Sequence, residues 1–133
     1  MDILLEVSAG DFLDRVSILE IKTERMADAA KRATVSAHLA SLAETRAAVM
    51  SAADLGSDYA ALKGVNEALW EIEDDIRKCE ATGDFGAEFI RLARAVYQTN
   101  DRRAAIKRVI DDKVGAGFVE EKEYVEYGGA HGD

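Results

Sequence analysis

The sequence predicts an all-α fold, namely an elongated antiparallel bundle of about four long helices with a short N-terminal arm and a C-terminal tail. None of the 133 residues is proline, and proline breaks helix interiors, so long uninterrupted helices are allowed. Apolar residues recur three and four positions apart over most of the chain, as they do on one face of a helix. The length suits a single domain, with a predicted core over about residues 9–113 and a tail over 114–133.

The chain begins with an apolar run, DILLEV at residues 2–7, which predicts the N-terminal arm. Ser8 is a candidate N-cap for a first helix over about residues 9–29. Most apolar residues of this helix form one stripe, but Ile18 and Ile21 lie off it. We therefore expect this helix to be buried on two sides or to present these isoleucines to a second chain.

Three further helices follow from the same spacing, over about residues 34–54, 58–81 and 85–113. Arg46 interrupts the apolar stripe of the helix predicted over 34–54. Gly83 is expected to end the third helix, because glycine takes the left-handed conformation that stops helices. Short connections favour antiparallel neighbours. Because these helices are long for so small a chain, a homodimer is expected to cover their exposed apolar faces.

Composition excludes several classes of partner and site. The net charge of −9 disfavours nucleic acid and anionic membranes, which need clustered Lys and Arg. Cys79 is the single cysteine, so an internal disulfide and a Cys-rich metal site are ruled out. No apolar run is long enough to cross a membrane, and the first residues lack the basic region of a signal peptide. The expected location is therefore the reducing cytoplasm.

Polar side chains are expected on the contact between the third and fourth helices. The turn at Gly83 places Asn66 beside Arg103, and it also brings Asn100 and Glu73 to this contact, with Arg94 beside Glu73. Buried polar groups cost free energy unless they are paired. This cluster is therefore either a matched structural network or a ligand site.

An acidic stripe runs along the third helix, where Glu67, Glu71 and Asp75 are four residues apart and Asp74 lies beside them. Like charges at this spacing repel. Mg²⁺, which prefers carboxylate oxygens, would relieve the repulsion. Arg102, Arg103 or a partner chain would relieve it equally well. A solvated helix face is the third interpretation.

Three segments resemble a family of small bacterial and phage proteins catalogued only as a domain of unknown function. They are residues 12–22, residues 65–77, and residues 89–107 without positions 98 and 99. Residues 120–124 fit the same family. The resemblance implies no particular chemistry. Its motifs are rich in charged and amide residues, which favours a polar ligand or a fixed interface. Together with the helix contact, they give the following candidate ligand-binding residues: Asn66, Glu73, Arg77, Arg94, Asn100, Asp101, Arg103 and Lys107.

The leading interpretation is a helical module that binds a partner protein or a small polar ligand as a homodimer, without a cofactor. The alternative is a Mg²⁺-dependent hydrolase acting on a nucleotide-like phosphate, similar to MazG-like enzymes, in which Glu71 and Asp74 would form one metal-binding pair. A resemblance to helical chorismate mutases is the remaining alternative. There the basic residues at the site would be Arg15, Lys22, Arg103 and Lys107.

Overall fold

A computed structural model describes residues 1–115 and confirms the predicted all-α class. Five helices and no strand lie within these residues, where about four long helices were expected. The helices are α1 (Ala9–Arg25), α2 (Ala29–Ser41), α3 (Ala43–Ala52), α4 (Gly56–Thr82) and α5 (Ala87–Val114). Residues 1–7 form no regular element and expose their apolar side chains, as expected for an arm. The predicted tail lies outside the described residues from position 116 onward.

The helix predicted over residues 34–54 is two helices, α2 and α3, and it starts earlier than expected. The carboxylate of Asp28 accepts a hydrogen bond from the backbone N–H of Lys31 at 3.0 Å. This side-chain cap starts α2 at Ala29. α1 ends at Arg25 rather than at residue 29, because Met26 takes an extended backbone. The break at Leu42 directs apolar residues from both short helices toward the same core.

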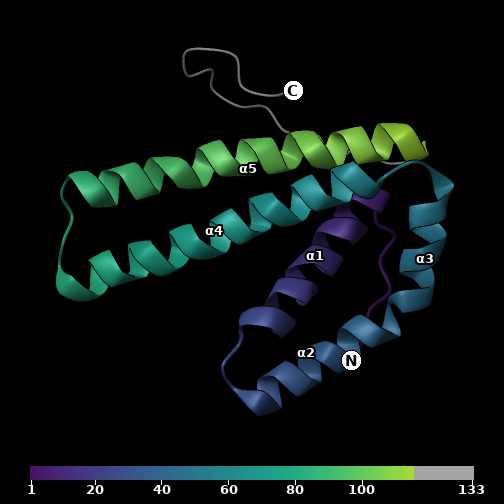
Figure 1. Cartoon of the computed structure of the whole chain (residues 1–133), viewed down its shortest axis with the longest axis horizontal. Coiled ribbons are helices and arrows are strands. Elements are labelled where there is room, and N and C mark those ends of the chain that lie inside the picture. The colour runs from purple at the N-terminus through teal and green to yellow at the C-terminus, as the bar shows by residue number, and fades with distance from the viewer. Residues whose placement is uncertain (116–133) are drawn as a thin grey trace.

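α4 and α5 form the antiparallel hairpin that the sequence predicts (Figure 1). Gly83 has a left-handed backbone with φ of 70°, and its N–H donates to the carbonyl oxygen of Glu80. The next N–H, of Asp84, donates to the carbonyl oxygen of Cys79 at 2.9 Å, which completes a helix-ending motif. At a rise of about 1.5 Å per residue, each helix is roughly 40 Å long.

α1, α2 and α3 gather at one end of the hairpin, and the other end extends past them (Figure 1). The main core forms where α1 packs against α4 and α5. Its fully buried members are Leu13, Val16, Leu55, Leu62 and Ile110, and Tyr59 lies at its edge. No helix in the described part of the chain has the length and apolar character needed to cross a membrane.

Ile18 and Ile21, which were expected either to be buried within the chain or to face a second chain, are covered by the chain itself. Ile21 is buried within the single chain, and Ile18 is half-buried. The first helix is therefore covered on two sides by its own chain, which was one of the two outcomes expected from its sequence. A second chain is not needed to cover Ile21.

Candidate functional site

A buried hydrogen-bond network joins α1 to the hairpin, and Asp14 of α1 is its centre. The Asp14 carboxylate is 3% exposed and accepts from both Asn66 Nδ2, at 2.9 Å, and Arg103 Nε, at 2.8 Å. The second carboxylate oxygen of Asp14 accepts from Nη2 of Arg103, so the ion pair is bidentate. Asn66 Nδ2 also donates to the Ser17 hydroxyl at 2.8 Å, and that hydroxyl donates to the Asp14 carbonyl oxygen at 2.7 Å.

This network brings Asn66 and Arg103 together, as the register of the α4–α5 hairpin predicts. They are joined through Asp14, which the sequence analysis did not place at this contact. Asp14 belongs to a different helix, so the spacing within α4 and α5 carries no information about it. The sequence signal for Asp14 is its position among the apolar residues of the first helix, directly after buried Leu13. Within residues 1–115 every buried side-chain nitrogen and oxygen has a hydrogen-bond partner, so the network is closed.

Two more polar contacts continue along α5 at intervals of one helical turn. Lys107 Nζ lies 3.3 Å from a carboxylate oxygen of Asp11. One turn further, the Asp111 carboxylate accepts from the backbone N–H of Gly10 at 2.7 Å. Together with the Asp14–Arg103 pair they form the α1–α5 contact row, which fixes the start of α1 against the second half of α5.

Three of the other candidate ligand-binding residues, Glu73, Arg77 and Arg94, make their contacts elsewhere on the hairpin. Glu73 and Arg77 are exposed and pair with each other at 4.0 Å. Arg94 is exposed and lies 3.4 Å from the hydroxyl of Tyr97, with Nε as the donor. Asn100 is exposed and Asp101 is buried. The structure therefore gathers Asn66, Arg103 and Lys107 beside α1. Glu73, Arg77 and Arg94 lie elsewhere along the hairpin.

The acidic stripe of α4 receives a positive charge from α1. Arg25 lies 3.6 Å from Glu67 and 3.3 Å from Glu71. Asp75 pairs with Lys78 at 3.5 Å on its own helix. A cation of the same chain thus relieves the predicted repulsion between Glu67 and Glu71. Among the residues that the structure describes, no group of three or more His, Cys, Asp and Glu side chains is placed to hold a metal ion.

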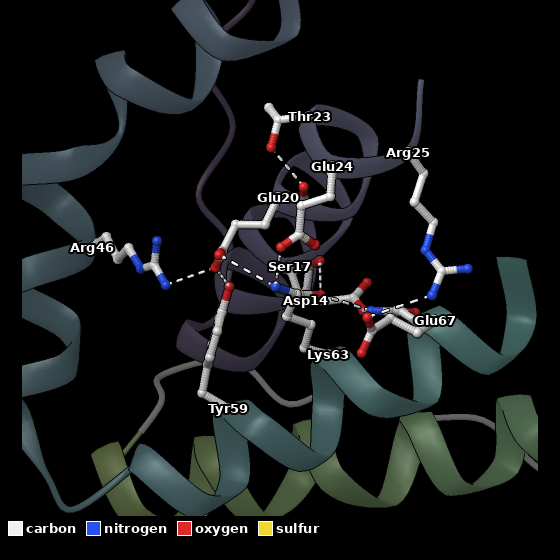
Figure 2. Close-up of polar contacts among 11 residues, drawn as sticks. Asp14, Ser17, Glu20, Thr23, Glu24, Arg25, Arg46, Tyr59, Lys63 and Glu67 are labelled. Atoms are coloured by element: carbon white, nitrogen blue, oxygen red, sulfur yellow. Dashed lines mark hydrogen bonds and ion pairs between the residues drawn. The ribbon is translucent and has the colours of Figure 1, made fainter. Parts of the chain in front are cut away.

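A second polar cluster, not anticipated from the sequence, surrounds Glu20 of α1 (Figure 2). Arg46 of α3 donates from Nη2 to Oε1 of Glu20 at 2.7 Å, and the Tyr59 hydroxyl of α4 donates to the same oxygen. Lys63 of α4 lies 3.5 Å from the other Glu20 oxygen and 3.0 Å from Glu24. Figure 2 shows these side chains of α3 and α4 converging on the Glu20 carboxylate of α1.

The environment of this cluster fixes its protonation. Burial alone would raise the pKa of Glu20, but the hydrogen bond from Tyr59 and the charges of Arg46 and Lys63 outweigh it and lower the pKa below its ordinary value. Burial and the hydrogen bond to Glu20 raise the pKa of the Tyr59 phenol. At neutral pH Glu20 is therefore ionised and Tyr59 is a protonated donor, an arrangement that holds Arg46 in place.

Beside the Glu20 cluster, a groove of about 540 Å³ lies between α1, α2 and α3. Its lining is mainly apolar, with Arg46 on one wall, where the guanidinium also lies 4.9 Å from the centre of the Tyr59 ring. The lining residues are Thr23, Ser36, Leu39, Ala40, Ala43, Arg46, Ala47 and Met50. Although the chain is acidic overall, residues 29–52 carry three basic side chains and one acidic side chain. The sequence signal for this groove is the interruption of an apolar stripe by Arg46.

Comparison with known proteins identifies a family. No curated protein and no solved structure matches the chain. The family model described as Family of unknown function (DUF6165) matches residues 3–127, which include the Asp14 network, the Glu20 cluster and the groove. The resemblance seen in the sequence motifs is thereby confirmed. The chain belongs to the family of unknown function DUF6165.

Proposed function

We propose that the protein is a helical binding module whose ligand is a small organic anion with an apolar body, held in the groove between α1, α2 and α3. The observation that carries this proposal is the position of Arg46, which belongs both to the groove wall and to the Glu20 cluster. Small-molecule sites are typically concave and mostly apolar, with a few convergent polar groups, and groups with perturbed pKa values mark such sites.

The groove has the size and lining for this class of ligand. Its volume of about 540 Å³ lies within the roughly 300–1,000 Å³ range of drug-sized ligand sites. Leu39 and Met50 supply apolar surface, and the thioether of methionine adapts to ligands of different shape. Ala40, Ala43 and Ala47 have short side chains, so a flat apolar group can approach the backbone of α2 and α3 closely.

Arg46 supplies the group that would recognise the anion. Its Nη2 is engaged by Glu20 at 2.7 Å, and a guanidinium has five N–H donors, so donors remain for a carboxylate in the groove. The ion pair and the Tyr59 ring hold the side chain in one orientation before a ligand arrives. Such preorganisation lowers the entropy cost of binding.

The test uses anilinonaphthalene sulfonate, a fluorescent probe that has an apolar aromatic body and one anionic group. We expect saturable fluorescence enhancement with the folded full chain. Arg46→Gln should weaken binding about tenfold, because a hydrogen bond to a charged group contributes about 1.5–3 kcal/mol. Ala47→Phe, which fills the groove without changing charge, should weaken binding as well.

Arg77→Gln is the matched control, because it removes an exposed arginine of the hairpin that does not line the groove. Its affinity for the probe should equal that of the wild type. Equal affinities in the wild type, Arg46→Gln and Ala47→Phe would refute the proposal. The hydrolase alternative would require Glu67 and Glu71 to release Arg25 before they could bind Mg²⁺, whereas the groove needs no such rearrangement.

A cytoplasmic location is part of the proposal. Its support is the state of Cys79, which is the single cysteine and is buried. Burial and the nearby charges of Asp84 and Glu88 raise the pKa of this thiol, so it stays protonated and poorly reactive. With a single cysteine that serves as a packing group, the chain forms no internal disulfide and needs no oxidising compartment to fold.

A further inference from the structure

The N-terminal arm, residues 1–7, carries exposed apolar side chains close to the groove. Ile3, Leu4 and Leu5 are 80%, 100% and 77% exposed. Figure 1 shows the arm leaving the start of α1 and running between α1 and α3 toward α2, and Figure 2 shows it between the same two helices. The residues that line the groove come from α1, α2 and α3, so the arm lies beside the groove without occupying it.

The arm has the starting point and the length needed to lie along the groove. It ends at Ser8, and the adjoining Ala9 packs against the same core as Met50, which lines the groove at this end. From Ser8 to Thr23, which lines the groove further along, α1 rises roughly 22 Å. Seven extended residues span roughly 23 Å. Ser8 itself has an extended backbone, with φ of −72° and ψ of 161°.

The arm also has the chemistry of the ligand class proposed for the groove. An extended backbone directs alternate side chains to opposite sides. The apolar residues that share one side are Ile3, Leu5 and Val7. Asp2 and Glu6 add two carboxylates to the arm. The groove is mainly apolar and has the cation of Arg46 on its wall, so the two surfaces are complementary in both polarity and charge.

We infer that the N-terminal arm competes with the ligand, docking in the groove when no ligand is bound and leaving it when a ligand binds. This inference rests on the proposed function, because it assigns a regulator to the same groove. The arm position in the structure corresponds to the undocked state. A short tether holds the arm at an effective concentration of millimolar order. Even a weak contact therefore lowers the apparent affinity for a free ligand, by the fraction of chains whose groove is open.

The first test measures the affinity of the full chain for anilinonaphthalene sulfonate. Ile3→Ser combined with Leu5→Ser should raise this affinity at least about threefold, because it removes the apolar contact of the competing arm. Asp2→Asn combined with Glu6→Gln should also raise it, because the carboxylates that compete for Arg46 are lost. Leu4→Ser is the matched control, since Leu4 belongs to the same arm but lies on its other side. Its affinity should equal that of the wild type.

The second test detects the docked arm without any ligand. Leu5→Cys combined with Ala47→Cys places one thiol on the apolar side of the arm and one in the groove lining. With oxidised glutathione, this variant should form an internal disulfide, seen by mass spectrometry as the loss of two hydrogen atoms. Leu4→Cys combined with Ala47→Cys should form the disulfide at least about tenfold more slowly. The native Cys79 is buried, so it does not compete for either thiol.

Three results would overturn the inference. The first is an unchanged probe affinity in both double variants of the arm. The second is a lower affinity in these variants, which would make the arm a strap that holds bound ligand. The third is an effect that grows with protein concentration, which would assign the docked arm to a second copy. The proposed function fails differently, because Arg46→Gln would then leave probe affinity unchanged while the disulfide still forms between arm and groove.

Discussion

Replacing Arg103 with leucine should destabilise the fold, because it leaves the Asp14 carboxylate buried with a single amide donor. Asp14 is 3% exposed and loses two hydrogen bonds from the guanidinium. Removing one partner of a fully buried ion pair costs about 3–5 kcal/mol. The Arg103 side chain is 29% exposed, so water reaches part of the site. We therefore expect a loss of about 2–3 kcal/mol.

Denaturant melts followed by circular dichroism measure this loss, and a double-mutant cycle with Asn66→Leu locates it. Because Asn66 and Arg103 share the Asp14 carboxylate, their coupling should exceed about 1 kcal/mol. Arg102→Leu is the matched control, since Arg102 is exposed and contacts Thr99 of its own helix. Its effect should stay within about 0.5 kcal/mol.

The opposite result would refute the structural interpretation of the Asp14 network. Suppose that Arg103→Leu leaves the free energy of unfolding unchanged or raises it, and that its coupling to Asn66→Leu is near zero. Asn66 and Arg103 would then be held beside Asp14 at a cost to stability. Functional sites commonly show that trade of stability for activity. The network would then be a ligand site, as the sequence also allowed.

Three further perturbations have defined outcomes. Gly10→Ala should destabilise the fold by about 1–3 kcal/mol in denaturant melts, because a β-carbon there would clash with the carbonyl oxygen of Lys107. Gly64→Ala, which has open space around it, should instead stabilise the fold by about 0.5–1 kcal/mol. The lowered pKa of Glu20 means that its stabilising contribution is present above the unfolded-state pKa and is lost as pH falls through the folded-state pKa. Glu20→Gln should therefore flatten the acid side of a curve of unfolding free energy against pH, and an unchanged curve would contradict the assignment. Asp28→Ala removes the cap of α2 and should cost about 0.5–2 kcal/mol, measured as a lower denaturant midpoint.

Local signals in the sequence predict the helices and the hairpin because those features depend on neighbouring residues. Ser8 caps α1 by accepting from the N–H of Asp11 at 3.1 Å, as its position predicts. Gly83 ends α4 in the left-handed conformation. The break at Leu42 was missed because neither glycine nor proline marks it, and packing of both short helices on one core determines it.

The site could be predicted only in part, since it depends on how α1 crosses the hairpin. The register around Gly83 places Asn66 near Arg103 because both residues belong to one hairpin. Asp14 and Glu20 meet their partners over sequence separations of 89 and 39 residues. Spacing within a single helix contains no information about such contacts. A charged residue within an apolar stripe, such as Arg46, was the available signal for the groove.

The α1–α5 contact row also constrains the order in which the chain folds. Gly10 and Asp111 are 101 residues apart, and Asp14 and Arg103 are 89 residues apart. During synthesis α1 is made before α5, so Asp14 is made well before Arg103, one of the two residues that donate to its carboxylate. The α4–α5 hairpin closes a short turn and can form quickly, whereas docking of α1 carries the entropy of closing a long loop. Until α5 is made, Asp14 lacks its arginine partner, so the α1–α5 contact row can form only after the whole α4–α5 hairpin has been synthesised.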